Sequence, residues 1–159
     1  MNYKWFNTLD EFVEWEMRVN KGSKTQITRD VIISMYKELY PNSVVKNSTT
    51  KDFMIDEILK KKSLKEIYEE RKEFDFGIKP YHWKCKFKLS SSQMKKMIEK
   101  GYLLHEVYSV YEKVFTGTYA NVSYYKAEDY FNTKIDEVEK WKEDNIRGYK
   151  KRKYNTLKK

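Results

Sequence analysis

The chain has 159 residues, of which 40% are hydrophobic and 16% aromatic, and its formal net charge is +9. This apolar content excludes a disordered chain, and the lack of a long apolar run predicts no membrane span and no membrane partner. A single cysteine, Cys85, excludes an internal disulfide and is typical of a reducing compartment, so we expect a cytoplasmic protein. The basic charge excludes a DNA mimic, which must be acidic, and favours nucleic acid or an acidic protein face as the partner.

The N-terminal region, residues 1–72, has the apolar spacing of several short helices. Thr8 followed by Glu11, and Ser63 followed by Glu66, have the spacing of helix N-terminal capping boxes. Further helices are predicted over about residues 28–40, where Pro41 ends the pattern, and over about residues 51–61. In the latter we expect four apolar side chains to be buried: Phe53, Met54, Ile58 and Leu59.

Residues 73–80 form a predicted connector that contains Phe74, Phe76, Gly77 and Pro80. Glycine and proline favour a break between elements, whereas the two phenylalanines indicate a packed segment. We therefore place a domain boundary here.

Residues 81–103 resemble a helix-turn-helix. Trp83 and Phe87 are expected to face inward on a short first helix, and a turn follows at residues 88–89. Ser90 and Gln93 have capping-box spacing and predict the start of the second helix. Its predicted apolar stripe consists of Met94, Met97 and Ile98, and Gly101 suits the left-handed conformation of a helix end.

A β-hairpin is predicted directly after this helix pair. Residues 103–115 and 119–125 are rich in valine and tyrosine, and Thr116-Gly117-Thr118 lies between them with turn composition. Helix, helix and hairpin in this order resemble a winged helix, a frequent DNA-binding fold. We predict an α+β fold with a helical N-terminal half, a winged-helix-like helix plus β-hairpin over residues 81–146, and a C-terminal helix.

Lysines accumulate in the helix-turn-helix-like segment, where residues 79–102 contain seven lysines and one acidic residue, Glu99. In a DNA-bound winged helix the second helix lies in the major groove. Glutamine pairs with adenine there, and lysine with guanine or phosphate. The outward positions proposed for such contacts are Ser91, Ser92, Gln93, Lys95 and Lys96. The alternative is an ordinary solvated, lysine-rich helix face.

The C-terminal helix is predicted to begin near Ala127 and to pass Lys142, or alternatively to break at Asn132 with a second helix capped by Thr133. Residues 147–159 form a basic tail with no acidic residue. Such a tail can neutralise the phosphates of RNA or DNA, or it can be a solvated end. Its candidate binding residues are Arg147, Lys150, Lys151, Arg152 and Lys153.

Tyrosines are concentrated in the predicted hairpin. A strand alternates its side chains, so one face of the hairpin is expected to pack inward and the other to be exposed. Exposed tyrosines on a rigid hairpin are effective anchors in protein interfaces. The candidates are Tyr108, Tyr111, Tyr119, Tyr124 and Tyr125, although the C-terminal helix can also cover some of them.

Motifs of catalysis and metal binding are weak. His82 and Cys85 have metal-ligand spacing, but the chain has one other histidine and no second cysteine, whereas a stable zinc site needs about four ligands. Glu70-Arg71-Lys72 has the Glu-x-Lys spacing of some nucleases but lies in a predicted helix. We expect a protein that is not an enzyme and that has no metal and no cofactor.

The segment 81–103, the hairpin after it, the small size and the Lys-, Asn-, Ile- and Tyr-rich composition resemble small staphylococcal anti-CRISPR proteins that inhibit type II Cas nucleases. The resemblance implies stoichiometric binding to a Cas nuclease with its guide RNA, inside a bacterial host cell. Among the available modes, the basic charge favours restraint of the HNH nuclease domain over DNA mimicry. The alternative is a winged helix-turn-helix DNA-binding regulator of a phage or mobile element.

Overall fold

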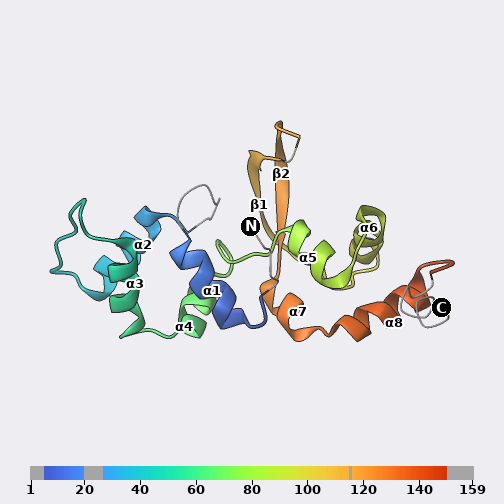
Figure 1. Cartoon of the computed structure of the whole chain (residues 1–159), viewed down its shortest axis with the longest axis horizontal. Helices are drawn as coiled ribbons and strands as arrows, with labels where there is room; N and C mark the ends of the chain where they lie inside the picture. The colour runs from blue at the N-terminus through green and yellow to red at the C-terminus, as the bar shows by residue number, and fades with distance from the viewer. Residues whose placement is uncertain (1–5, 20–26, 115, 150–159) are drawn as a thin grey trace, which may run out of the picture. The chain divides into compact units, whose positions relative to one another are not determined.

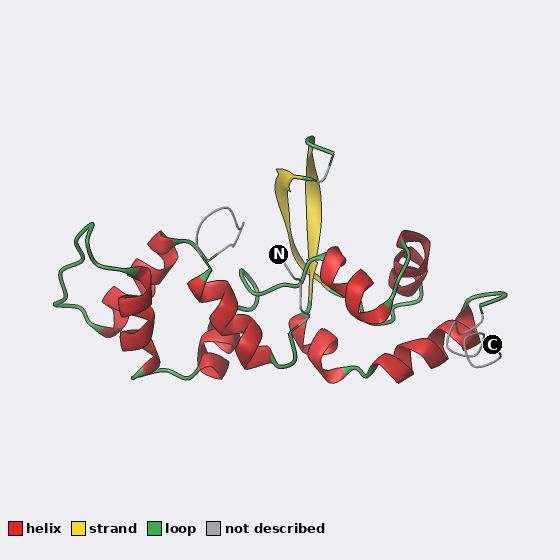
Figure 2. Ribbon diagram, viewed as in Figure 1, coloured by secondary structure: helices red, strands yellow, loops and turns green. Residues whose placement is uncertain are grey.

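The computed structural model describes residues 6–19, 27–114 and 116–149, which divide into two compact units. One unit is Phe6–Gly77, and the other contains Ile78 and the residues after it. Over the described ranges the chain forms eight helices and a two-stranded antiparallel sheet (Figure 2). The predicted α+β class and the predicted order of elements are therefore confirmed. Within these ranges, no helix is long and apolar enough to cross a membrane.

The first unit contains four helices, α1 (Leu9–Arg18), α2 (Arg29–Leu39), α3 (Lys51–Leu59) and α4 (Leu64–Arg71) (Figure 1). Each begins after a hydroxyl residue whose oxygen accepts a backbone N–H of the first turn: Thr8, Thr28, Thr50 and Ser63. Ser63 and Glu66 make both hydrogen bonds of the predicted capping box. At α1 the Glu11 carboxylate instead accepts from the N–H of Asn7, so only the threonine half of that box forms.

Apolar side chains of all four helices fill the core of the first unit, and the fully buried ones include Val13, Met17, Ile32, Met54 and Ile67. The prediction for α3 is wrong at Phe53, which is 50% exposed, and at Leu59, which is only half-buried. Phe53 instead meets the Tyr36 ring edge-on, with centroids 6.3 Å apart, and Ile55 is buried in the core. Helical spacing alone does not distinguish these neighbouring faces of a short helix.

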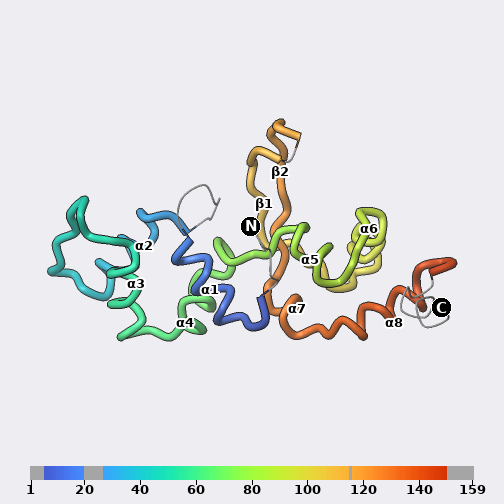
Figure 3. Tube along the Cα trace, in the orientation of Figure 1, coloured from blue at the N-terminus to red at the C-terminus, as the bar shows by residue number. Residues whose placement is uncertain are grey.

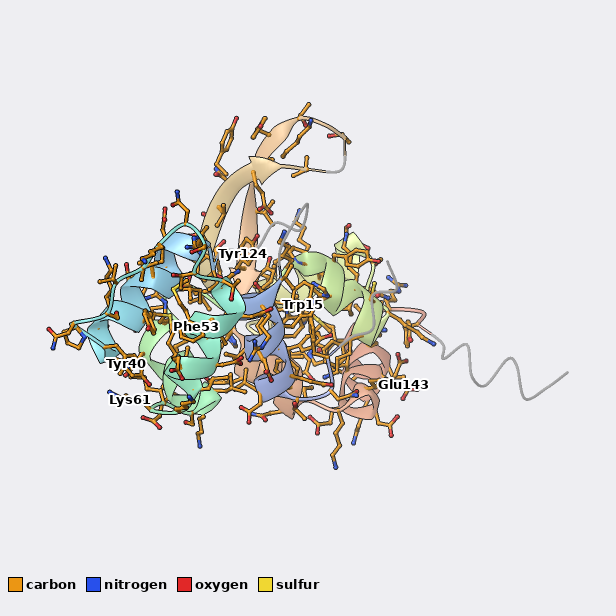
Figure 4. All side chains as sticks on the ribbon, turned by 60° about the vertical axis from the view of Figure 1, so that its left-hand side comes forward. Trp15, Tyr40, Phe53, Lys61, Tyr124 and Glu143 are labelled. Atoms are coloured by element: carbon orange, nitrogen blue, oxygen red, sulfur yellow. The ribbon has the colours of Figure 1, made fainter. Side chains whose placement is uncertain are left out.

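Polar side chains join the ends of the helices in this unit. Lys51 is buried and donates to the carbonyls of Val19 and Ile27, at the two sides of residues 20–26. Burial lowers the pKa of the Lys51 ammonium, against the opposing effect of Asp52. Lys61 donates to the Leu39 carbonyl at the end of α2 and lies over the Tyr40 ring, 4.1 Å from its centroid (Figure 4).

The predicted connector, residues 73–80, contains the division between the units, at Gly77 and Ile78. Three of its side chains, Asp75, Phe76 and Ile78, are buried, whereas Phe74 is exposed. Asp75 accepts from the Arg71 guanidinium at 2.7 Å, and burial still raises its pKa. The segment is thus packed, as the phenylalanines indicated, although Phe74 does not take part.

The second unit consists of α5 (Pro80–Phe87), α6 (Ser91–Glu99), β1 (Glu106–Lys113), β2 (Tyr119–Tyr125), α7 (Ala127–Asn132) and α8 (Ile135–Asn145). Its core is aromatic: Trp83 is fully buried and meets the Phe87, Tyr125 and Tyr130 rings at centroid distances of 5.7, 6.3 and 5.3 Å. The base of the hairpin and α7 therefore both pack on α5. Figure 3 shows the hairpin extending away from the helices of this unit.

The C-terminal helix breaks, which confirms the alternative of two helices over that of one. The predicted cap is wrong, because Thr133 is the C-cap of α7 and does not cap α8. The N-cap of α8 is Lys134, whose side chain makes no capping hydrogen bond. In α6, the predicted stripe is correct for Met94 and Met97 and wrong for Ile98, which is 47% exposed. Gly101 has the expected positive φ of 68°.

Lys142 of α8 is the central polar group of this unit. Only 1% of the residue is exposed, and its ammonium donates to the carbonyls of Phe87 and Lys88 at 2.8 and 3.0 Å and to Glu139 at 3.1 Å. These carbonyls lie at the end of α5, where helical partners are lacking, and Lys88 is left-handed, with φ of 50°. A buried ammonium with three donors is thus fully satisfied, and it holds α8 against the turn between α5 and α6.

Replacing Lys142 with methionine is expected to lower the free energy of unfolding by about 3 kcal/mol, because two backbone carbonyls and a carboxylate lose their donor. The measurement is the midpoint of urea unfolding followed by circular dichroism. Lys140→Met is the matched control on the same helix, at an exposed position, and should change stability by less than about 0.5 kcal/mol. Equal effects of the two substitutions would contradict a clamp by Lys142.

Candidate partner-binding surface

The hairpin pairs β1 with β2 in a register that places Tyr108 opposite Tyr124 and Tyr111 opposite Asn121. An irregularity between Glu106 and Tyr108 shifts the alternation of β1 near its start. The two faces of the hairpin consequently carry different tyrosines. One face presents the odd-numbered residues of the distal part, including Tyr111 and Tyr119, and the other presents the even-numbered residues, including Tyr108 and Tyr124.

The odd-numbered face carries the exposed tyrosines of this hairpin. The Tyr111 and Tyr119 rings stack with centroids 5.6 Å apart and an interplanar angle of 23°. The residues are 67% and 60% exposed, although each ring shields part of the other. The stack limits the rotamers of both side chains before any partner binds, so little conformational entropy remains to be lost on binding. Ser109, Lys113 and Asn121 are exposed on the same face.

The even-numbered face is occupied by the protein itself. Tyr108 and Tyr124 stack with centroids 5.0 Å apart, and the Tyr124 hydroxyl donates to the Glu112 carboxylate at 3.1 Å. Lys79 forms an ion pair with Glu112 at 3.4 Å and lies 5.6 Å from the centre of the Tyr124 ring. These contacts attach the hairpin to the residue that precedes α5.

For two of the five tyrosines predicted as interface anchors, the prediction is wrong. Tyr124 and Tyr125 are 3% and 7% exposed, so they are parts of the core and not of an open surface. Tyr125 packs on Trp83, and burial raises the pKa of its phenol. Sequence alternation did not reveal this burial because two consecutive strand residues become buried only where the hairpin joins the helices. Tyr108 is half-buried, which leaves Tyr111 and Tyr119 as exposed candidates.

The second predicted surface, on α6, is partly used by the fold. Gln93 accepts from the N–H of Ser90 at 3.0 Å, and Ser90 accepts from the N–H of Gln93 at 3.1 Å, which confirms the capping box. The oxygen of Gln93 thus already accepts one hydrogen bond, and the capping box competes with the proposed contact of this side chain with adenine. Ser91 accepts from the Lys84 ammonium at 2.8 Å.

The lysines of α6 differ from each other in exposure. Lys95 is exposed and Lys96 is half-buried. Arg147 is exposed beyond the end of α8. The other four candidates of the basic tail, Lys150, Lys151, Arg152 and Lys153, lie outside the described residues. The structure therefore brings Ser91, Ser92 and Lys95 to one solvent-facing side of α6, next to the exposed Ile98.

Lys86 and Lys142 stabilise the fold through hydrogen bonds to backbone carbonyls, a role that was not predicted from the sequence. Lys86 donates to the carbonyl of Tyr130 near the end of α7 and lies 4.4 Å from the centre of the Tyr130 ring. Burial lowers the pKa of its ammonium. A signal existed for Lys142, because it follows Val138 by four residues and so shares the apolar side of α8. The count of seven lysines in residues 79–102 thus overstates the charge available to a partner.

The weak metal and nuclease motifs are not assembled into a site. Among the residues that the structure describes, no three His, Cys, Asp or Glu side chains are grouped to hold a metal ion. Glu70 lies on α4 in an ion pair with Lys62. His82 is half-buried on α5, and burial together with the neighbouring Lys79 lowers its pKa to about 4.

No family model, no curated protein and no solved structure matches this chain.

The depressed pKa of His82 predicts a pH dependence of stability. In the unfolded chain His82 is protonated below about pH 6.5, whereas in the folded chain it is protonated only below about pH 4. Between these pH values, acid therefore stabilises the unfolded state relative to the folded state. Lowering the pH from 7 to 5 should therefore destabilise the wild type by about 1–2 kcal/mol more than the His82→Gln variant. Urea unfolding of both proteins at the two pH values measures this difference, and parallel losses would contradict it.

Proposed function

We propose that this protein is a stoichiometric inhibitor that binds a type II Cas nuclease and blocks cleavage of target DNA. The observation that carries the binding surface is the exposed Tyr111–Tyr119 stack, placed on a hairpin whose opposite face is fixed by internal contacts. Tyrosines of this kind bury large areas at low entropic loss and are frequent in the energetic centres of protein interfaces. The choice of a Cas nuclease as partner rests on the resemblance of the sequence to anti-CRISPR proteins.

The charge of the second unit supports an acidic counterpart. Lys113 flanks the tyrosine stack, and Lys88, Lys95 and Lys100 are exposed on or beside α5 and α6. A tyrosine stack with one lysine beside it, in a unit that carries further exposed lysines, fits an acidic protein face better than it fits the phosphate-binding channel of the nuclease. Restraint of the HNH domain is the mode of inhibition that this chemistry favours, because docking of that domain is a separate step after target binding.

The alternative proposal is a DNA-binding regulator that uses α6. The observation in its favour is the order of α5, the capped helix α6 and the hairpin, with Ser91, Ser92 and Lys95 facing solvent. The capping hydrogen bond of Gln93 weakens this alternative, because the side chain best suited to read adenine already accepts from the N–H of Ser90. Phosphate contacts through Lys95 remain available to this alternative.

The test is a cleavage assay with a purified staphylococcal type II Cas nuclease, its guide RNA and target DNA, titrated with this protein. Cleavage should be lost near one protomer per nuclease while target binding, measured by gel shift, is retained. Loss of both binding and cleavage would place the site on the DNA path. Unchanged cleavage at large excess, repeated with a second Cas orthologue, would reject the inhibitor and favour the regulator.

Substitutions locate the surface in the same assay. Tyr111→Ala combined with Tyr119→Ala should raise the half-inhibitory concentration at least about tenfold, because both anchors are removed. Tyr81→Ala is the matched control, since Tyr81 is a 49% exposed tyrosine of the same unit on α5. Lys95→Ala combined with Lys96→Ala should leave inhibition within about twofold. If the double lysine substitution abolishes inhibition and the double tyrosine substitution does not, the binding surface lies on α6 and not on the hairpin.

A further inference from the structure

The outer edge of β2, the edge away from β1, exposes backbone hydrogen-bonding groups. Tyr125 uses its N–H and its carbonyl on that edge, in a two-bond bridge with Ile78 at 3.0 and 2.8 Å. On the other side, Thr118 accepts from the N–H of Val114, across the hairpin. Backbone groups alternate along an antiparallel strand, so the N–H and carbonyl groups of Tyr119, Asn121 and Ser123 point to the same outer edge as those of Tyr125.

This edge lacks the features that normally protect an edge strand. Residues 119–125 contain no charged residue and no proline, whereas β1 contains Glu106, Glu112 and Lys113. The irregularity of the hairpin also lies on β1. Proteins commonly place lysine, proline or a bulge on an exposed edge to prevent pairing with another chain. An edge without them is suited to such pairing.

The chemistry and the length of this edge fit a second copy of the same strand. Antiparallel pairing centred on Asn121 places Tyr119 of each copy opposite Ser123 of the other, with no charges brought together. The pairing ends naturally on both sides, because the position opposite Tyr125 is then occupied by Gly117, in the hairpin turn. Ile78 already holds that end of the edge, so about five residues remain for the second copy.

We propose that two copies of this protein pair through the outer edges of β2 and form a four-stranded antiparallel sheet. The twofold axis runs perpendicular to the sheet through the Asn121 pair, so the same face of both hairpins lies on the same side. Tyr111 and Tyr119 of both copies therefore stand on one continuous surface and are left uncovered. This assembly goes beyond the proposed function and does not depend on the identity of the partner.

The experiment is sedimentation equilibrium of the whole chain from low to high micromolar concentration. Asn121→Pro removes the outward N–H at the centre of the pairing and leaves the β1–β2 bonds intact, because proline is tolerated on the open side of an edge strand. The wild type should dimerise, Asn121→Ala should dimerise equally, and Asn121→Pro should raise the dissociation constant at least about tenfold. Circular dichroism and the unfolding midpoint establish that each variant is folded.

A second variant guards against misfolding of the proline protein. Asn121→Lys places two ammonium groups across the twofold axis at an exposed position, and should weaken the dimer severalfold without changing the fold. A wild type that is monomeric at all concentrations would overturn the proposal. A dimer that neither substitution weakens would also overturn it. A monomer whose edge substitutions weaken only binding to the nuclease would overturn it as well, because the edge of β2 would then pair with a strand of the nuclease.

Discussion

The second unit depends on the burial of one ammonium group, that of Lys142. Taking a charge out of water is unfavourable unless its hydrogen bonds are replaced, and Phe87, Lys88 and Glu139 replace all three. The ammonium thereby fixes the end of α5, the helix that carries Trp83. Because the hairpin base and α7 pack on that indole, the position of the exposed tyrosines follows from the same clamp.

Lysine is used repeatedly in this protein to complete helix ends. Lys51, Lys61, Lys86 and Lys142 donate to carbonyls at or near the ends of α1, α2, α7 and α5, where such groups lack helical partners. A positive balance in the sequence is therefore not equivalent to a basic surface. Residues 6–77 contain 13 basic and 14 acidic residues, so the net positive charge belongs to the remainder of the chain.

Local rules predicted much of the fold, and long-range packing determined the rest. The caps at Thr8, Ser63 and Ser90 follow from short sequence patterns, and the structure confirms them. The burial of Lys142 and Tyr125 depends on residues more than 40 positions away, which no local pattern contains. Of the predicted site residues, Tyr111 and Tyr119 are exposed. Tyr124 and Gln93 instead make hydrogen bonds within the protein, to Glu112 and to the N–H of Ser90.

The proposed binding surface lies on the hairpin, whose base packs on Trp83 of α5. Hydrogen–deuterium exchange of the protein, alone and with the guide-loaded nuclease, tests this claim most directly, because it locates protection without substitutions. Amide exchange in residues 106–125 should slow on binding, whereas exchange in α6 should stay unchanged. Protection confined to α6, with the hairpin unchanged, would contradict it.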